Sequence, residues 1–599
     1  MHDFEVEKEK KINDSASLGA FYKHINRALS HKSDIGTLTD SKGEVLLDNL
    51  SKANLFNEYF ASVGVKDDGI KPLCITSTSY LDKLETIHFD CSNVKAAMQK
   101  LKSNLSSGPD NMPPVLFKRL KNSLATPLAM AFEQLLSVAA VPNEWKSAII
   151  TPVFKKGVTS IVSNYRPISL TCVPSKIMER VITQQILDHL QLNNILHPSQ
   201  HGFLKGRSTC TNLLESINDW TLYIENSNAV VIAYVDFSKA FDSVCHEKLF
   251  VRLLSYGIDG TLLKWLQNFF CDRTLQTRVG KTLSESASLC SGVVQGSGIG
   301  PLMFLIFLNE LAAILEKHGV KVKFFADDVK IYSCITNNCD CDKLKNALQE
   351  LAEWAKTWQL SVSIDKCYIV NIGCFETDDV NYCLNDTVLP TVKSCRDLGV
   401  IISNDLSPSL HINAVVAKAH QRANIILRCF LSRNITSLVK AFKVYVRPLV
   451  EYNSIIWSPQ QKQHIECVER VQRCFTKRLP GMNHLSYDER LKCTGLQCLE
   501  LRRLQFDLIW CYKIVFGLVN VDSSDFFHSN TCIITRGHPY KLYKQHCKKR
   551  NRAEFFTQRV LNLWNSLPQD TVNFNSLFVF KNTIKRLDMS KYVKLQLES

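Results

Sequence analysis

The stretch Phe324-Phe325-Ala326-Asp327-Asp328-Val329-Lys330 places two adjacent carboxylates between short, β-prone apolar flanks. Apolar side chains alternate with others before the acids, and β-formers follow them. This pattern predicts a strand, a tight turn and a second strand, with both acids at the tip. Neighbouring side chains point to opposite faces, so one acid can bind a metal ion directly while the other adjusts the local electrostatic field. A solvated turn is the alternative, since Asp67-Asp68 and Asp378-Asp379 are similar pairs without a preceding strand.

A second decisive stretch is the apolar run from Val230 to Val235, which ends in Asp236 and Phe237. Continuous runs of this kind predict a central strand that is buried on both faces. An acid at the end of such a strand is desolvated unless a cation binds it. The residues alone leave two interpretations: Asp236 binds a cation, or it caps a helix that follows the turn Ser238–Asp242.

A Gly-rich loop with a single Gln, Ser291 to Pro301, leads into a predicted helix, Leu302 to Leu315. Such a loop at a helix N-terminus offers backbone donors and permits close approach of a ligand. It is neither a P-loop nor a dinucleotide fingerprint, because no Lys-Ser or Lys-Thr pair follows and the spacing is wrong.

Upstream of these stretches, basic residues lie at two neighbouring tips of a predicted hairpin. Lys155 and Lys156 follow a β-prone run, and Arg166 begins the next one about ten residues later. This spacing could bring the three cations together on one sheet, where Arg grips phosphate oxygens bidentately and Lys acts as a point charge. A basic, solvated hairpin is the alternative on charge alone.

Composition narrows the class of protein. At 599 residues the chain is too long for one core, and its formal net charge of +15 suggests a polyanionic partner such as nucleic acid. The 22 cysteines include no Cys-x-x-Cys pair, which indicates free thiols in a reducing compartment.

Targeting signals are sparse. The N-terminus has no apolar signal region, so we do not expect secretion. The most apolar window, Ile299 to Leu315, is too short to span a bilayer, so we expect no membrane partner. The basic cluster Lys548-Lys549-Arg550-Asn551-Arg552 is a candidate nuclear import signal or nucleic-acid contact, although such runs are more often solvated surface. We expect a nuclear location after cytoplasmic synthesis.

The order of these elements carries a resemblance. A buried strand ending in Asp236, the Gly-Gln loop, the Asp-Asp hairpin and Lys366 follow one another, with basic residues upstream. Together they resemble the reverse transcriptases of non-LTR (LINE-type) retrotransposons, close to the jockey-like group, over roughly residues 90 to 520. Val294 departs from the usual Pro, and Gly298-Ile299 from the usual pair, but no catalytic group is lost. The matching stretches are Asn164–Leu170, Gln200–Thr209, Tyr234–Asp242, Val294–Pro301, Phe325–Asp328, Leu360–Lys366 and Asp397–Val400.

The resemblance implies an α+β right-hand polymerase with fingers, a palm made of an antiparallel sheet with the Asp-Asp hairpin, and a helical thumb. Its implied activity is RNA-directed DNA polymerase, copying retrotransposon RNA into DNA from an RNA template, a DNA primer and dNTPs. The expected parts are an N-terminal connector without chemistry (1–90), a helical extension (91–135), fingers and palm (136–405), a thumb (406–515) and a basic C-terminal region (516–599).

The resemblance also implies roles for single residues. Two Mg²⁺ ions, or Mn²⁺, would be held by Asp236, Asp327 and Asp328, and Lys366 would be the general acid for pyrophosphate. Leu398 and Gly399 would grip the primer, and the ring of Phe241 would exclude a ribose 2′-hydroxyl. The nucleotide-binding set is Lys155, Lys156, Arg166, Phe237 (whose carbonyl oxygen would also be a metal ligand), Phe241, Gln295 and Gly296.

Two rival classes remain. One is another reverse transcriptase, such as an intron maturase, which should carry an intron-binding segment and often a zinc-nuclease tail. The other is an inactive relic that only binds RNA. LINE-type polyproteins usually carry an N-terminal endonuclease, and only about 85 residues precede the matching region. We therefore expect an endonuclease to come from a separate or missing domain.

Overall fold

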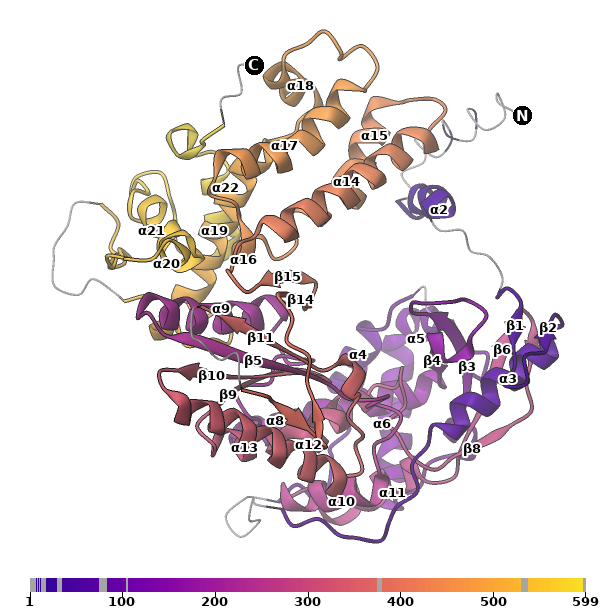
Figure 1. Cartoon of the computed structure of the whole chain (residues 1–599). Helices are drawn as coiled ribbons and strands as arrows, with labels where there is room; N and C mark the ends of the chain where they lie inside the picture. The colour runs from indigo at the N-terminus through magenta and orange to yellow at the C-terminus, as the bar shows by residue number, and fades with distance from the viewer. Residues whose placement is uncertain are drawn as a thin grey trace.

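The described residues form two large β-sheets with covering helices, together with three two-stranded sheets (Figure 1). The computed structural model describes residues 7, 9, 11, 18–29, 35–74, 83–103, 106–373, 380–528 and 537–595 of the 599. Both large sheets lie in the part of the chain before residue 373, and the described part after residue 403 is helical with loops.

The first sheet has four strands and is antiparallel throughout. In sheet order its strands are β11 (Tyr368–Ile372), β5 (Ala229–Asp236), β10 (Asp328–Ile335) and β9 (Lys321–Phe325). The register of β5 and β10 sets Asp236 opposite Asp328 and Tyr234 opposite Lys330. Pairing of these strands thus places acids from two distant motifs side by side.

Both faces of this sheet are buried, as the continuous apolar run predicts. On β5, Val231, Ala233 and Val235 belong to one hydrophobic core, and the alternate residues Val230 and Ile232 belong to another. The first core includes residues of α8 (Val173–Leu192), α12 (Gly300–Glu316) and α13 (Asn338–Thr357), and α9 (Thr209–Glu225) covers the other face (Figure 1).

The second sheet is mixed. Its strands run in the order β4 (Tyr165–Leu170), β3 (Ser147–Phe154), β6 (Arg273–Val279) and β7 (Thr282–Leu283), with β8 (Ala287–Leu289) also paired to β6. Strand β3 is antiparallel to β4 and parallel to β6. Helix α3 (Asn49–Ser62) lies along this sheet in Figure 1, and its Phe56 packs edge-to-face on Tyr165 at 4.9 Å.

Shorter elements surround the sheets. Residues 114–137 form two consecutive helices that divide at Leu120. The elements are β1 (Leu38–Thr39), β2 (Val45–Leu46), α4 (Cys91–Gln99), α5 (Pro114–Arg119), α6 (Lys121–Ser137), α7 (Asn143–Lys146), α10 (His246–Ser255), α11 (Gly260–Phe270), β12 (Cys383–Leu384), β13 (Thr387–Val388), β14 (Ser394–Asp397) and β15 (Val400–Ser403).

The described C-terminal part of the chain is an assembly of helices and loops. Its longest helix, α14, buries Ile412, Ala419, Ala423 and Ile426 on one stripe. None of the helices in the described ranges is long and apolar enough to cross a membrane. The helices are α14 (Ser409–Cys429), α15 (Ile435–Ala441), α16 (Ser454–Trp457), α17 (Lys462–Lys477), α18 (Tyr487–Thr494), α19 (Leu499–Val515), α20 (Arg550–Glu554), α21 (Phe556–Asn565) and α22 (Leu577–Ile584); α2 (Leu18–Leu29) packs against α14.

The basic cluster at 548–552 is partly structural rather than wholly solvated. The side chain of Arg552 is buried and donates to the Asn218 side-chain oxygen at 2.8 Å and the Thr221 hydroxyl at 3.1 Å, both on α9. The backbone amides of Lys548 and Lys549 donate to the Glu225 carboxylate. These contacts anchor the C-terminal region to the helix that covers the first sheet.

Candidate active site

The predicted acids meet where β5 ends and β10 begins. The expected strand–turn–strand forms from β9 and β10, with Ala326 and Asp327 in the turn and Ala326 at φ 57°. Of the two other Asp-Asp pairs, Asp68 bonds Lys248 at 2.9 Å, and Asp378-Asp379 lies outside the described residues. The hairpin pairs with β5, and this pairing distinguishes Asp327-Asp328 from Asp67-Asp68.

Negative charge accumulates at this point. Burial raises the pKa of Asp327, and the nearby charge of Asp236 raises it further. Burial, followed by repulsion from Asp327 and Asp236, raises the pKa of Asp328 to about 6. The ammonium of Lys366 lies 2.9 Å from Asp236 Oδ2. The cluster therefore favours cations, and the Asp236 carboxylate is already paired with the Lys366 ammonium.

Helix capping by Asp236 is wrong as an interpretation. Residues 238–242 form a turn, and α10 starts only at His246, with Cys245 as its N-cap residue. The Asp236 carbonyl instead accepts a hydrogen bond from the Ser363 amide at 2.8 Å, next to the turn that carries Lys366.

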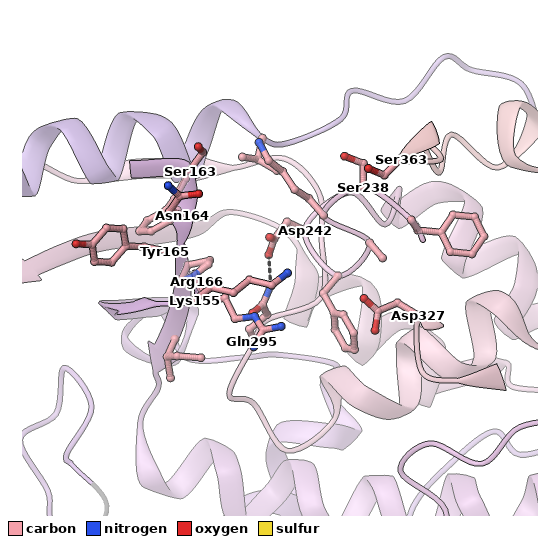
Figure 2. A pocket seen from close by; sticks show the side chains of 18 of the residues that line it. Lys155, Ser163, Asn164, Tyr165, Arg166, Ser238, Asp242, Gln295, Asp327 and Ser363 are labelled. Carbon is pink, nitrogen blue, oxygen red and sulfur yellow. Dashed lines mark hydrogen bonds between the residues drawn. The ribbon is translucent and has the colours of Figure 1, made fainter. Parts of the chain in front are cut away.

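The acids open onto a cavity of about 690 Å³ (Figure 2). Ten of the residues selected from the sequence line it, whereas Asp328 and the pair Leu398-Gly399 do not. In Figure 2, Lys155 and Arg166 reach in from the second sheet, and Asp327 from the first. The ten residues are Lys155, Lys156, Arg166, Asp236, Phe237, Phe241, Gln295, Gly296, Asp327 and Lys366.

Cations gather on one wall of this cavity. Arg166 on β4 lies opposite Val153 on β3, and the amide of Lys155 donates to the Asn164 carbonyl at 2.8 Å. Burial lowers the pKa of Lys155, and the charges of Arg166 and Lys366 lower it further. Crowded cations of this kind suit a polyanionic ligand.

The described side chains do not form a ready metal centre. Within the described ranges, no group of three or more His, Cys, Asp and Glu side chains is arranged to hold a metal ion. The donors at the acid cluster are carboxylate oxygens, which suit Mg²⁺ or Mn²⁺ rather than Zn²⁺. Their mutual repulsion is the feature that a bound divalent cation would relieve.

Comparison with known proteins identifies this part of the chain. Residues 153–402 match the family model described as "Reverse transcriptase (RNA-dependent DNA polymerase)". These residues form a reverse transcriptase domain. The domain contains the acid cluster, the Gly-rich loop and Arg166, while Lys155 and Lys156 lie at its beginning.

Curated relatives support the same assignment. The chain is 28% identical over 407 residues to the probable RNA-directed DNA polymerase from transposon BS of Drosophila melanogaster. It is 25% identical over 401 residues to the polymerase from mobile element jockey and 22% over 473 residues to the probable polymerase from transposon X-element, both of the same species. These matches cover 63%, 65% and 74% of this chain but only 43%, 43% and 50% of the relatives. The predicted resemblance to non-LTR, jockey-like elements is confirmed, and the chain spans about half of each relative or less.

The Gly-rich loop of the reverse transcriptase domain contributes the floor of the cavity. The Gln295 side chain donates to Asp242 Oδ1 at 2.7 Å (Figure 2), and the main-chain carbonyl of Gln295 accepts from the Ser169 amide at 2.8 Å. Burial raises the pKa of Asp242 to about 6. Asp242 therefore orients Gln295, a role that the sequence did not reveal.

The backbone donors expected at the start of α12 are already used. Glu179, buried on α8, accepts from the amides of Gly298 at 2.6 Å and Ile299 at 3.3 Å. A carboxylate at a helix N-terminus is favoured by the helix dipole. The loop consequently offers fewer free donors to a ligand than its sequence suggested.

Gly296→Ala should destabilise the domain. Gly296 has φ +123°, and a Cβ there would lie 2.4 Å from the Ser169 carbonyl oxygen. Strain and overlap together predict a loss of about 2–4 kcal/mol in the free energy of unfolding, measured by urea denaturation. Gly43→Ala is the control, because Gly43 has φ +87° with nothing near its would-be Cβ. Equal losses in the two variants would contradict the close-approach explanation.

Phe241 lies in the turn after β5, not on a helix. Its ring stacks on Phe304 of α12 at 4.2 Å and 18°, and contacts Phe203 edge-on at 6.2 Å. It also lines the cavity, as does Phe237, whose side chain is buried with its ring centre 6.4 Å from that of Trp354. The ring of Phe241 is thus both packed and exposed to a ligand.

Leu398 and Gly399 form the turn between β14 and β15, outside the main cavity. The Tyr452 hydroxyl donates to the Leu398 carbonyl at 3.0 Å. The preceding residue, Asp397, is buried and accepts from Lys330 Nζ at 2.7 Å and the Tyr234 hydroxyl at 3.0 Å. Lys330 and Tyr234 each stand two positions from an acid of the cluster, so this turn is connected to it.

The sequence also did not reveal a set of hydrogen bonds that supports the Asp327-Asp328 hairpin. The Gln200 side-chain oxygen accepts from the Ala326 amide at 3.2 Å and from the Gly202 amide at 2.7 Å. A Cβ on Gly202 would lie 2.5 Å from the Ala326 nitrogen. The Gly-broken pattern of this loop was visible, but its partner across the fold was not.

Proposed function

We propose that the chain is an RNA-directed DNA polymerase that copies retrotransposon RNA into DNA. The observation that carries this proposal is a single cavity lined by Asp236 and Asp327 on one side and by Lys155 and Arg166 on another. Nucleotidyl transfer needs both: carboxylates for divalent cations and cations for a triphosphate. The reverse transcriptase domain supports the assignment.

In this proposal the first sheet, of four strands, is the palm, and the second sheet, of five strands, is the fingers. The helices from α14 onward include the thumb. Asp236, Asp327 and Asp328, with the Phe237 carbonyl, would hold two Mg²⁺ or Mn²⁺ ions. When bound, such a pair supplies charge stabilisation to the attacking and leaving oxygens of an in-line displacement. The oxygen-only donors, and the raised pKa values of Asp327 and Asp328, support this fit.

The chain's own residues would perform the remaining tasks. Lys155, Lys156 and Arg166 would neutralise the triphosphate. Lys366, an ammonium beside Asp236, would give a proton to the departing pyrophosphate. Gln295, oriented by Asp242, would support the nucleotide and template, and the Leu398-Gly399 turn would hold the primer end. An RNA template, a DNA primer and dNTPs are the proposed partners, and the nucleus is the proposed place of action.

Primer extension by the purified chain tests the proposal. With oligo(dT) annealed to poly(rA), dTTP and Mg²⁺, we expect extended primers, and none with EDTA. An RNA-binding relic would retain the template without extending the primer, and that result would refute the polymerase.

Phe241→Ala should admit ribonucleotides. In our proposal the ring abuts the sugar of the incoming nucleotide and leaves no room for a 2′-hydroxyl. Steric exclusion worth about 1–3 kcal/mol predicts a rise of roughly ten- to a few-hundred-fold in the efficiency of UTP relative to dTTP. Single-nucleotide kinetics with both substrates, alongside a melting curve, measure it.

Phe250→Ala is the matched control, since Phe250 is buried in the same core but outside the cavity. It should lower stability without changing the ratio of the two efficiencies. An unchanged ratio in folded Phe241→Ala would show that Phe241 is a core aromatic and no gate.

A further inference from the structure

A helix from outside the matched domain forms part of the cavity wall. Tyr59, Phe60 and Val63, at the end of α3, line the same space as Asp236 and Arg166. The family match begins at residue 153, well after α3. The sequence had indicated a connector without chemistry for this region, so its contact with the cavity is a finding of the structure.

The position of this wall is fixed by polar contacts to its surroundings. Asn57 accepts from the Thr277 hydroxyl at 3.0 Å and donates to the Glu285 carbonyl at 2.9 Å, both in the region of β6 to β8. Further along, the Val65 amide donates to the Ser291 hydroxyl at 2.9 Å, at the start of the Gly-rich loop. A segment held at both ends in this way can place a side chain accurately.

The end of α3 positions the side chain of Lys239. This residue stands three positions after Asp236, lines the cavity and adopts a left-handed φ of 49°, which is uncommon for Lys. Its ammonium lies 4.5 Å from the centre of the Tyr59 ring. A cation over an aromatic face is attracted to it and loses some of its freedom.

We propose that Lys239, held over Tyr59, binds the triphosphate of the incoming nucleotide. A ring face attracts the ammonium without using its N–H donors as a carboxylate would, so they remain available to phosphate oxygens. Asp242 is near enough to feel the charge of Lys239, but it accepts its hydrogen bond from Gln295. Lys239 thus joins Lys155, Lys156 and Arg166 around one polyanion. The inference rests on the proposed function and assigns α3 to its nucleotide site.

Equilibrium binding of dTTP tests this without any need for catalysis. The full chain is loaded with poly(rA) and a dideoxy-terminated oligo(dT) primer in Mg²⁺, and dTTP and inorganic pyrophosphate are titrated. Lys239→Gln should weaken dTTP binding about ten-fold or more, with a parallel loss for pyrophosphate. Tyr59→Ala should weaken it about two- to five-fold, whereas Tyr59→Phe, which keeps the ring, should match the parent.

Lys42→Gln is the charge-matched control, since Lys42 is exposed and does not line the cavity. Weaker binding and a smaller salt dependence for the template–primer, with dTTP affinity unchanged, would place Lys239 on a backbone phosphate and overturn the proposal. So would equal losses in Tyr59→Phe and Tyr59→Ala. If Tyr59→Ala fails to fold, Lys239→Gln, in a surface turn, still decides the matter. If the chain binds dTTP but never extends a primer, the proposed polymerase activity is refuted. The dTTP affinities of the variants would still show whether Lys239 binds the triphosphate.

Discussion

Asp327→Asn or Asp236→Asn should lower primer extension by about a thousand-fold or more while RNA binding persists. In the proposed site each carboxylate holds a divalent cation, and losing a ligand removes several kcal/mol of transition-state stabilisation. The amide is nearly isosteric, so packing is preserved. The contacts that we propose between phosphates and the side chains of Lys155 and Arg166 would be unaffected. Extension rates and filter binding of RNA on the same preparations measure the two effects.

Asp342→Asn is a matched control, because Asp342 is exposed on α13 and lies outside the cavity. It should behave like the parent. Asp378, a partner in another Asp-Asp pair, lies outside the described residues and serves less well. Near-parent rates in Asp327→Asn, or an equal loss in Asp342→Asn, would show that the metal assignment is wrong.

Lys330→Met should cost about 3–5 kcal/mol in the free energy of unfolding. Lys330 and Asp397 form a buried ion pair whose side chains are 4% and 6% exposed. Burial lowers the pKa of Lys330, and Asp397 opposes that change. Removing one partner leaves the other charge buried and uncompensated, which is the expensive outcome. Urea denaturation of the purified variant measures the loss.

The pair also links the Leu398-Gly399 turn to the acids, so a second readout is available. Lys330→Met combined with Asp397→Asn removes both charges and keeps an acceptor for Tyr234, and should recover more than half of the stability. If the Lys330–Asp397 pair positions the primer, this folded double variant should have a higher KM for primer–template than the parent. Parent-like stability in Lys330→Met alone would contradict the buried pair, and a parent-like KM in the double variant would contradict the positioning role.

Local patterns predicted the elements that carry the acids. The unbroken apolar run before Asp236 can be satisfied only by burial on both faces, and two cores indeed receive its alternate residues. The tip of the Asp327-Asp328 hairpin follows from alternation and a tight turn. Such features depend on neighbours in the chain and can be recognised there.

Features that depend on distant partners could not be predicted in this way. Glu179 is one acid on an amphipathic helix until α12 is brought against it, more than a hundred residues later. Tyr59 is likewise an ordinary aromatic on α3 until the fold sets its ring beneath Lys239. The stack of Phe241 on Phe304 is also invisible locally, because the second ring comes from the distant helix α12.

The most direct test of the account is the sequence of the DNA that the purified chain makes on an RNA of defined, non-repetitive sequence. With a DNA primer, four dNTPs and Mg²⁺, the account predicts DNA complementary to that RNA, and none from Asp236→Asn. Bound RNA without any product, or a product unrelated to the RNA sequence, would contradict it.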